Sequence, residues 1–279
     1  MRHTNGGHDM SNRFDGQVVV ITGGGGGIGK ASARRFLDEG ARVALSGTRS
    51  AVLEAAQAEL DPTGERTLTH AGHITRREQA HELVDRAVER FGGVDVLVNS
   101  TGIFRPVPFT EQTEEQLEEA LGSILRPTFW VSQAVIEPMR ERGGGAIVNV
   151  GSMWALDAIA TTPTSAYSMA QAGRHALTKN LAIELAHDRI RVNTVALAFV
   201  ETPAYERFMT PDEARAVLES VDAFHPLGRH GQPEDVVEAV AFLASRDAGW
   251  ITGTTLPIDG GVLAGRSPAV QPETAAAAA

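Results

Sequence analysis

A glycine-rich run is the clearest chemical signal in this sequence. Residues 22–29 read Thr-Gly-Gly-Gly-Gly-Gly-Ile-Gly and lie between a β-branched run and a helical stretch. Glycines allow the backbone to turn tightly and to approach a pyrophosphate, while the free amides and the positive dipole end of the following helix attract the anion. Because a strand precedes the run and a helix follows it, the pattern predicts a dinucleotide site and not merely a flexible loop.

Short β-rich runs alternate with longer helical stretches over most of the chain. Strands are expected at residues 17–22, 42–46, 66–70, 94–98, 146–150, 190–196 and 254–258. Helices are expected at residues 30–39, 51–60, 76–91, 113–142, 165–187 and 234–245. This alternation predicts right-handed βαβ units, and the continuous Val/Ile/Leu strands indicate burial on both sides. We therefore expect an α/β fold with one Rossmann-type, doubly wound parallel sheet and helices on both faces.

The same pattern predicts one domain. No proline- or serine-rich linker interrupts residues 14–262. Residues 1–13 are polar and are expected to form an N-terminal tail. Residues 263–279 end in five alanines, so we expect a flexible C-terminal tail there.

The composition excludes several classes of protein. The chain of 279 residues has 25 Lys+Arg against 35 Asp+Glu, a formal charge of −10, and it contains no cysteine. The absence of cysteine rules out disulfides, thiolate metal sites and a cysteine nucleophile, and the acidic balance argues against a nucleic-acid surface. We assign no metal site, and we find no apolar signal segment and no run near the roughly 18 apolar residues of a membrane span. A soluble, cytoplasmic protein is the expectation.

Several motifs accompany the glycine run. Residues 99–102 read Asn-Ser-Thr-Gly, residues 148–152 read Val-Asn-Val-Gly-Ser, and residues 165–167 read Ser-Ala-Tyr. With the glycine run and with residues 226–229, 232–235, 251–253 and 259–261, they resemble the short-chain dehydrogenase/reductase family from Phe14 to Gly261. Its cofactor motif is matched by Thr22, Gly23, Gly27, Ile28 and Gly29. The resemblance implies a nicotinamide cofactor, a small-molecule substrate and a homo-oligomer, either a tetramer or a dimer.

The resemblance also assigns an active site, which is degenerate in this chain. In the family a tyrosine gives or takes the substrate proton, and a serine holds the substrate oxygen. A lysine binds the nicotinamide ribose and lowers the tyrosine pKa, and an asparagine holds a water of the proton relay. Tyr167 and Ser152 match the first two. Gln171 stands at the lysine position and Ile124 at the asparagine position, with Ser123 as the alternative under a one-residue shift of register.

Loss of the lysine has a physical consequence for Tyr167. Free tyrosine has a pKa of about 10, and a neutral glutamine favours the phenolate much less than an ammonium does. Helix spacing places Gln171 on the same face as Tyr167, where its amide can bind ribose hydroxyls, so we assign Gln171 to the catalytic and cofactor sites. Lys179, Arg174 and His175 are expected at the helix surface or in a subunit contact.

The residues that distinguish NAD from NADP are expected at the end of the second strand. An acidic side chain there would bind the adenosine 2′-hydroxyl and repel a 2′-phosphate. Residues 46–49 read Ser-Gly-Thr-Arg and contain no acid. Thr48 and Arg49 could hold a phosphate, which favours NADP over NAD, although Arg49 could also be a solvated loop charge. The resemblance adds Asn99, Gly102 and Thr202 to the cofactor-binding residues.

The substrate pocket should lie outside the carboxyl ends of the strands. Aromatic residues and methionines on those loops are its expected walls: Phe104, Met153, Trp154, Phe199, Tyr205, Phe208 and Met209. Such a wall suits an apolar or ring-bearing substrate. The alternative is that half of these side chains cap the core.

Three classes of function fit these residues. The first is an NAD(P)H-dependent oxidoreductase that reduces a carbonyl or oxidises an alcohol, with Tyr167 as acid/base and Ser152 orienting the substrate. The second is a non-redox enzyme on the same scaffold, such as a dehydratase, cyclase or isomerase. The third is a catalytically inactive cofactor-binding homologue. Retention of both Ser152 and Tyr167 favours the first class, whereas the missing lysine and asparagine favour the other two.

Overall fold

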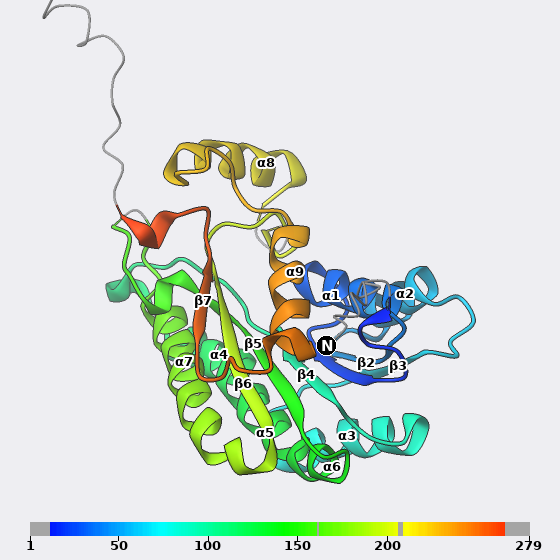
Figure 1. The fold of residues 1–279 in the computed structure, drawn as a ribbon. Helices are drawn as coiled ribbons and strands as arrows, with labels where there is room; N and C mark the ends of the chain where they lie inside the picture. The colour runs from blue at the N-terminus through cyan, green and yellow to red at the C-terminus, as the bar shows by residue number, and fades with distance from the viewer. Residues whose placement is uncertain (1–11, 161, 206–208, 266–279) are drawn as a thin grey trace, which may run out of the picture.

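Parallel strands form one sheet in the computed structural model, which describes residues 12–160, 162–205 and 209–265. The strands are β1 (Val18–Thr22), β2 (Arg42–Gly47), β3 (Thr67–Ala71), β4 (Val96–Asn99), β5 (Gly145–Ser152), β6 (Ile190–Leu197) and β7 (Thr255–Ile258). Their order is β3-β2-β1-β4-β5-β6-β7, and every neighbouring pair is parallel (Figure 1). This arrangement confirms the predicted Rossmann-type α/β fold.

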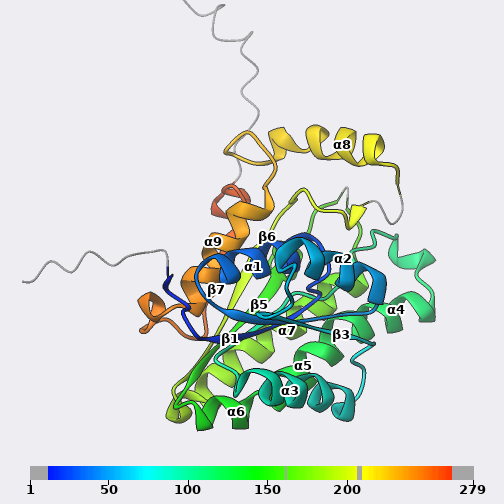
Figure 2. The ribbon, with the colours of Figure 1, turned by 90° about the vertical axis from the view of Figure 1, so that its right-hand side faces the viewer.

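Two layers of helices enclose the sheet (Figure 2). One layer contains α1 (Gly27–Asp38), α2 (Ser50–Leu60) and α9 (Pro233–Ala244), and the other contains α3 (Arg77–Phe91), α5 (Arg126–Ala134), α6 (Ile136–Glu141) and α7 (Ser165–Glu184). Each layer forms an apolar core with the sheet, the first including Phe36 and Val240 and the second including Leu83 and Val131. Because both faces are covered, all five residues of β1 are buried, as expected for a continuous apolar strand.

The strand order reverses between β1 and β4. The chain first winds outward from β1 to β3 and then returns to place β4 on the other side of β1. The loops that leave β1 and β4 therefore diverge at the carboxyl edge of the sheet, which is where ligands bind in folds of this type. The glycine run, residues 99–102 and Ser152 all lie at this edge.

The long helical stretch expected at residues 113–142 is divided. α4 (Glu114–Ala120) is followed by a π turn (Leu121–Leu125), then by α5 and α6. Pro127 in the first turn of α5 has no amide hydrogen, so one bond of the regular helical ladder is missing. Close to this break, the Thr128 hydroxyl donates to the Ile124 carbonyl at 2.6 Å. The sequence pattern predicted the helical content but not this break.

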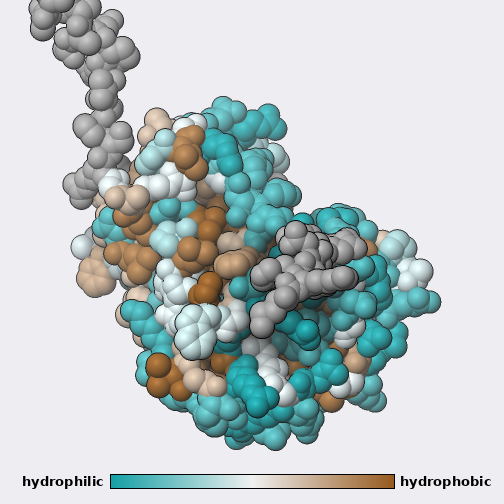
Figure 3. Space-filling model, in the orientation of Figure 1, coloured by the Kyte–Doolittle hydropathy of each residue, from teal (hydrophilic) through white to brown (hydrophobic). Residues whose placement is uncertain are grey.

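The remaining elements connect the layers. α8 (Pro211–Ser220) lies above the carboxyl edge of the sheet in Figure 1. Short 3-10 turns occur at Phe109–Glu111, Met153–Ala155, Ala186–Asp188, Asp222–Phe224, Arg246–Ala248 and Val262–Ala264. Figure 3 shows apolar side chains gathered around the β7 edge and beneath α8, whereas the side formed by α1 and α2 is largely hydrophilic. In the part of the chain that the structure describes, no helix is both long and apolar enough to cross a membrane.

Candidate functional site

The glycine run forms a tight turn between β1 and α1. Gly23 has a φ of +72°, and a Cβ there would lie 2.7 Å from the Ser100 carbonyl oxygen, so glycine is required. A Cβ on Gly29 would lie 2.2 Å from the Gly23 carbonyl oxygen, which shows how closely α1 approaches the loop. No side chain caps the start of α1, and its first turn contains no acidic residue. The turn therefore presents open amides and a positive dipole end to an anion.

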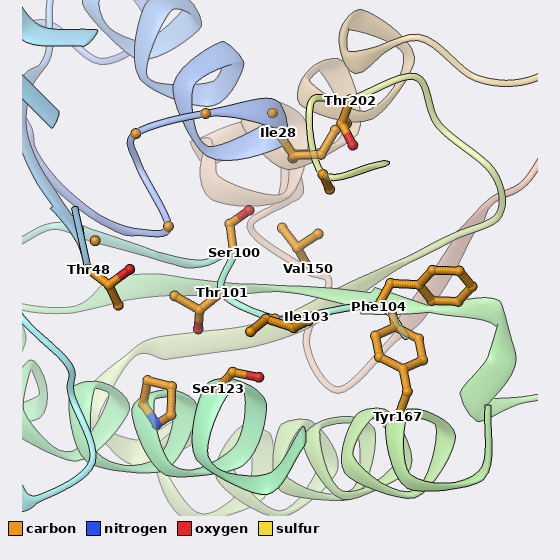
Figure 4. Close-up of a pocket in the computed structure, with 18 of the residues that line it drawn as sticks. Ile28, Thr48, Ser100, Thr101, Ile103, Phe104, Ser123, Val150, Tyr167 and Thr202 are labelled. Atoms are coloured by element: carbon orange, nitrogen blue, oxygen red, sulfur yellow. The ribbon is translucent and has the colours of Figure 1, made fainter. Parts of the chain in front are cut away.

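A cavity of about 800 Å³ extends from this turn across the carboxyl ends of β4 and β5 to α7 (Figure 4). Its volume lies in the range of small-molecule sites. Most residues that the sequence predicts for cofactor or substrate line it: Gly23, Gly27, Ile28, Thr48, Arg49, Gly102, Phe104, Ser152, Trp154, Tyr167, Gln171, Thr202 and Tyr205. The structure thus brings the expected phosphate turn and the expected acid–base pair into one continuous space.

Thr22 and Asn99 lie beneath the cavity instead of in its wall. Both are fully buried, and the Thr22 hydroxyl accepts a hydrogen bond from the Ser100 amide at 3.2 Å. Asn99 Nδ2 donates to Asn149 Oδ1 at 2.9 Å and to Ser132 Oγ at 3.1 Å. These contacts fix β1 and β4 relative to their neighbours, so both side chains act on the cavity by positioning its backbone.

Tyr167, Ser152 and Gln171 meet on the floor of the cavity. Ser152 ends β5, while Tyr167 and Gln171 lie about one turn apart on α7. Gln171 Nε2 donates to Tyr167 Oη at 3.1 Å, and the Ser152 hydroxyl lies close to the phenol. Burial raises the pKa of Tyr167 above its ordinary value, and the neighbouring Ser152 and Gln171 side chains oppose that rise. The phenol is therefore neutral at pH 7 and able to donate a proton.

Ser123 and Ile124 face different directions from the π turn. Ile124 is fully buried in a cluster with Ala120, Ala166 and Ala170. Ser123 lines the cavity, and Figure 4 shows its side chain pointing from the helix toward it. Ile124 is the residue that the sequence predicts at the asparagine position, but the side chain that reaches the cavity is that of Ser123, the alternative under a one-residue shift of register.

Aromatic side chains close one end of the cavity. Phe104 packs against Trp154 and Tyr167, with ring centroids 5.4 Å and 5.1 Å apart respectively. Tyr205 also lines this end, and burial raises the pKa of its phenol. A flat ring would therefore meet apolar surfaces of matching shape here.

Other predicted wall residues do not reach the cavity. Met153 and Phe199 are buried in the apolar cluster behind Trp154 because their side chains point into the core. Met209 is described but does not line the cavity. Phe208 lies outside the described residues.

Three polar atoms of the cavity residues lack a hydrogen-bond partner among the described residues. They are Thr101 Oγ1, Ser123 Oγ and Trp154 Nε1, and all three are buried. Buried polar groups are normally hydrogen-bonded, so these three atoms keep unused hydrogen-bonding capacity at the site. The sequence analysis missed Thr101, although the stretch at residues 99–102 marked its neighbourhood. Within residues 12–265, apart from the gaps given above, no cluster of His, Asp and Glu could hold a metal ion.

Known proteins are similar to this chain over most of its length. The family model described as enoyl-(acyl carrier protein) reductase matches residues 23–263. The 3-oxoacyl-(acyl-carrier-protein) reductase FabG of Thermotoga maritima is 36% identical over 251 residues, covering 90% of this chain and 99% of that protein. The cis-4-hydroxycyclohexanecarboxylate dehydrogenase of Sinomonas cyclohexanicum is 36% identical over 256 residues, covering 91% and 100%. The solved structure of levodione reductase has a TM-score of 0.83 and 33% identity, covering 91% and 100%. The chain belongs to the short-chain dehydrogenase/reductase family.

Membership of the short-chain dehydrogenase/reductase family favours one of the three classes of function. These relatives are named as reductases or dehydrogenases, which supports an NAD(P)-dependent oxidoreductase over a non-redox enzyme or an inactive homologue. The residues of the cavity fit a nicotinamide dinucleotide. The uncapped α1 would hold the pyrophosphate, and a Cβ on Gly27 would come within 3.4 Å of Thr202, so the loop and Thr202 form a close cradle.

Arg174 and His175 on α7 lie in the interior of the protein and not at its surface. They were expected at the helix surface or in a subunit contact, but they are only 0% and 5% exposed. The Arg174 guanidinium donates to the Thr101 carbonyl at 2.7 Å, and His175 Nε2 accepts from the Ser152 amide at 3.4 Å. The prediction was wrong because backbone acceptors and donors from other segments surround this face, which a helical pattern does not reveal. Lys179, by contrast, is exposed.

Proposed function

We propose that this chain is an NADP-dependent oxidoreductase that reduces a carbonyl or oxidises an alcohol on a small, ring-bearing substrate. The observation that carries the proposal is the position of Tyr167. Its phenol contacts Ser152 and Gln171 on the floor of the cavity that begins at the glycine turn. A proton donor and a phosphate-binding turn in one cavity are what a nicotinamide-dependent reaction on oxygen requires.

The chain's own residues would hold the substrate oxygen and move the proton. A bound nicotinamide cofactor would supply the hydride exchanged with the substrate carbon. Tyr167 holds a proton on Oη at pH 7, which suits donation to a carbonyl oxygen that becomes a hydroxyl. Ser152 Oγ lies beside the same phenol and would orient that oxygen. In the oxidation of an alcohol, Tyr167 would take the proton back.

The cavity wall supports a ring-bearing substrate. Phe104 and Trp154 form an apolar corner next to Tyr167, and Trp154 Nε1 is a buried donor with no partner among the described residues. This corner would hold a ring by its faces and one polar substituent by the indole N–H. The name cis-4-hydroxycyclohexanecarboxylate dehydrogenase describes a six-membered ring that bears a hydroxyl. We extend that substrate class to this chain.

The end of β2 supports NADP over NAD. Thr48 and Arg49 line the cavity, and Arg49 is exposed, so its guanidinium is free to meet a phosphate. The sequence between Ser46 and Arg49 offers no carboxylate to bind a 2′-hydroxyl. A guanidinium and a hydroxyl suit a 2′-phosphate.

Exposed apolar side chains on α5 and α7 support a homo-oligomer, which we propose for this chain. Phe129 is 46% exposed, Met169 52% and Ile183 80%. Large exposed apolar groups are typical of association surfaces. Sedimentation or light scattering would measure the mass, and a monomer at micromolar concentration would contradict the proposed homo-oligomer.

A cytoplasmic location stays a prediction from the sequence.

Binding and turnover assays separate the proposal from its alternatives. Thermal shift with NADPH and NADH tests cofactor binding, and loss of NADPH absorbance with a panel of cyclic ketones tests reduction. We expect stabilisation by NADPH and oxidation of NADPH with at least one ketone, both measured beside Tyr167→Phe. Cofactor binding with no oxidation by any ketone would contradict the proposal. Conversion of a substrate without any change in cofactor redox state would indicate a non-redox enzyme instead.

A further inference from the structure

A fully buried arginine lies directly behind the active-site tyrosine. Arg174 is 0% exposed, and every hydrogen-bond partner of its guanidinium among the described residues is neutral. Burial lowers the pKa of Arg174 to about 10, so the group keeps its charge at pH 7. A buried cation without an ion-pair partner is unfavourable unless the structure uses it.

The guanidinium joins four segments that surround the active site. Nε donates to the Thr128 hydroxyl of α5 at 3.0 Å, and Nη1 donates to the Val150 carbonyl of β5. Nη2 donates to the Thr101 carbonyl after β4 at 2.7 Å and to the Ile124 carbonyl of the π turn at 3.2 Å. These contacts explain how the charge is tolerated, but they do not explain why a cation stands at this position.

The link to the active site runs through Gln171. Arg174 Nη1 lies 3.4 Å from Gln171 Oε1, while Gln171 Nε2 lies 3.1 Å from Tyr167 Oη. A guanidinium can only donate hydrogen bonds, so it fixes the amide oxygen toward Arg174 and the amide N–H toward Tyr167. The guanidinium polarises the amide, whose N–H points at Tyr167 Oη. This orientation stabilises a negative charge on the phenol oxygen.

We propose that Arg174 is a positioning residue of this active site, whose buried guanidinium orients the Gln171 amide toward Tyr167 and supplies the positive charge that favours the phenolate. The proposal rests on the proposed role of Tyr167 as acid/base. The charge of Arg174 also acts to lower the pKa of Tyr167, against the effect of burial. A neutral glutamine at position 171 is then compatible with a phenol that ionises during turnover.

Among the described residues, few other charged groups face Tyr167 and Arg174. On α7 the neighbour is His175, whose pKa is lowered to about 4 mainly by burial, so it is neutral at pH 7. Tyr205 faces the phenol from the loop after β6. The charged residues of the cavity rim on α4 and α5 are already paired, Glu119 with Arg105 and Glu118 with Arg126. In the part of the chain that the structure describes, Arg174 is therefore the charge that distinguishes the surroundings of this phenol.

The test uses the small number of tyrosines. The chain has two, Tyr167 and Tyr205, so Tyr205→Phe leaves Tyr167 as the sole phenol. Incorporation of 3-fluorotyrosine, whose phenol is more acidic than that of tyrosine, brings its ionisation into an accessible range, and near-ultraviolet absorbance follows the titration. The titration is done on the protein without cofactor or substrate. Its outcome is thus independent of the proposed function, which is contradicted separately if no NADPH is oxidised.

Removing the guanidinium and replacing it with another cation should have different effects on Tyr167 ionisation. Arg174→Met should raise the midpoint of Tyr167 ionisation by roughly one pH unit or more, and Arg174→Lys, which keeps the charge, should restore at least half of that shift. The matched control is Arg191→Met. Arg191 is another largely buried arginine that donates to backbone carbonyls, but it lies near the amino end of β6, whereas Tyr167 lies near the carboxyl ends of the strands. Its removal should therefore leave the midpoint of Tyr167 ionisation unchanged. An unchanged midpoint in a folded Arg174→Met protein overturns the proposal.

A second variant keeps the proposal testable if Arg174→Met does not fold. Gln171→Met leaves the guanidinium in place and removes the amide between it and Tyr167. The midpoint of Tyr167 ionisation should rise, because the phenolate loses its donor. A folded Gln171→Met protein with an unchanged midpoint shows that Gln171 carries no effect of Arg174 and overturns the proposal.

Discussion

Gln171 Nε2 lies 3.1 Å from Tyr167 Oη, so the amide that stands at the family's lysine position contacts the phenol directly. The sequence analysis assigned this amide to the ribose of the cofactor. One of its two hydrogens is directed to Tyr167 and its oxygen to Arg174, which leaves one hydrogen for any other partner. Under the proposed function, this single side chain would couple binding of the cofactor to ionisation of Tyr167.

Removal of the phenol hydroxyl should abolish most of the activity and leave the fold intact. Tyr167→Phe removes the proton donor while keeping the ring contact with Phe104. We expect kcat to fall by roughly 10²–10⁴-fold, the usual contribution of a positioned acid. Tyr205→Phe is the matched control: it keeps a ring in the cavity wall and removes the phenol that does not receive the Gln171 hydrogen bond, so its kcat should fall far less. A similar fall in both variants would show that the loss is structural.

Lysine at position 171 should conflict with Arg174. In Gln171→Lys an ammonium would approach the guanidinium that now lies 3.4 Å from the amide oxygen. We expect the free energy of unfolding to fall by about 1–3 kcal/mol, as for close like charges of partial burial. In an Arg174→Met background the same substitution should be neutral or stabilising. Urea unfolding of the four proteins measures this coupling, and additive effects would refute it.

Acid should destabilise the protein through His175. Burial, and then the charges of Arg174 and Lys179, lower the pKa of His175 to about 4. The unfolded state, with a pKa near 6.5, binds the proton first, so stability is full above pH 6.5 and is lost as the pH falls from 6.5 toward 4. Between pH 7 and pH 5 this group should contribute a loss of about 2 kcal/mol.

Urea unfolding of His175→Gln at several pH values checks this assignment. The variant should lose less stability than the parent between pH 7 and pH 5, since glutamine does not titrate. Ala176→Gln is the control, because it changes an exposed residue of α7 without adding or removing a titratable group, and it should leave the pH dependence unchanged. Parallel pH curves for the parent and His175→Gln would exclude His175 as the source.

Arg49→Ala should weaken NADPH binding selectively. Arg49 is exposed and lines the cavity just after β2, and a guanidinium there would suit a phosphate. We expect Kd for NADPH to rise by roughly 10-fold or more, from the loss of a charge-assisted contact, with Kd for NADH unchanged. Fluorescence titration with both cofactors measures the two constants. Equal weakening of both would assign Arg49 to the loop structure instead.

Trp154→Phe should raise KM for an oxygen-bearing ring substrate. The substitution keeps an aromatic ring next to Phe104 and Phe199 but removes the unpartnered Nε1 donor. We expect KM to rise by about 10-fold and Kd for NADPH to stay constant. Steady-state kinetics with a ring ketone that bears a second polar substituent, and with the same ketone lacking that substituent, would measure this. KM for the ketone without the substituent should change little, and an equal change in both KM values would attribute the effect to packing.

The fold could be predicted because its signals are local. The glycine run and the alternation of apolar strands with helices lie within short windows of sequence, and each strand run appears as a parallel strand. The motif residues at strand ends were also predictable, since parallel strands bring their carboxyl ends to one edge. Ser152 and Tyr167 thus meet as the resemblance implied.

What could not be predicted depends on contacts between distant segments. The burial of Arg174 needs acceptors from Thr101, Ile124 and Val150, which come from three other parts of the chain. The break in the helix at residues 113–142 involves Pro127, but a proline near a helix start is compatible with either an intact helix or a π turn. Met153 and Phe199 have the composition of a pocket wall, and their inward orientation is fixed by packing.

The π turn sets the rotational phase of the helical segment that follows it. In an uninterrupted α-helix, at about 100° per residue, Ser123 and Ser132 would lie on opposite sides. The wider turn at Leu121–Leu125 reduces that angle, so that Ser123 lines the cavity while Ser132 accepts from Asn99 of β4. Deletion of a single residue from this turn would rotate one of the two serines away from its partner. The number of residues in this turn is therefore fixed by the two serine contacts. This holds even at positions of the turn whose side chains contribute no contact.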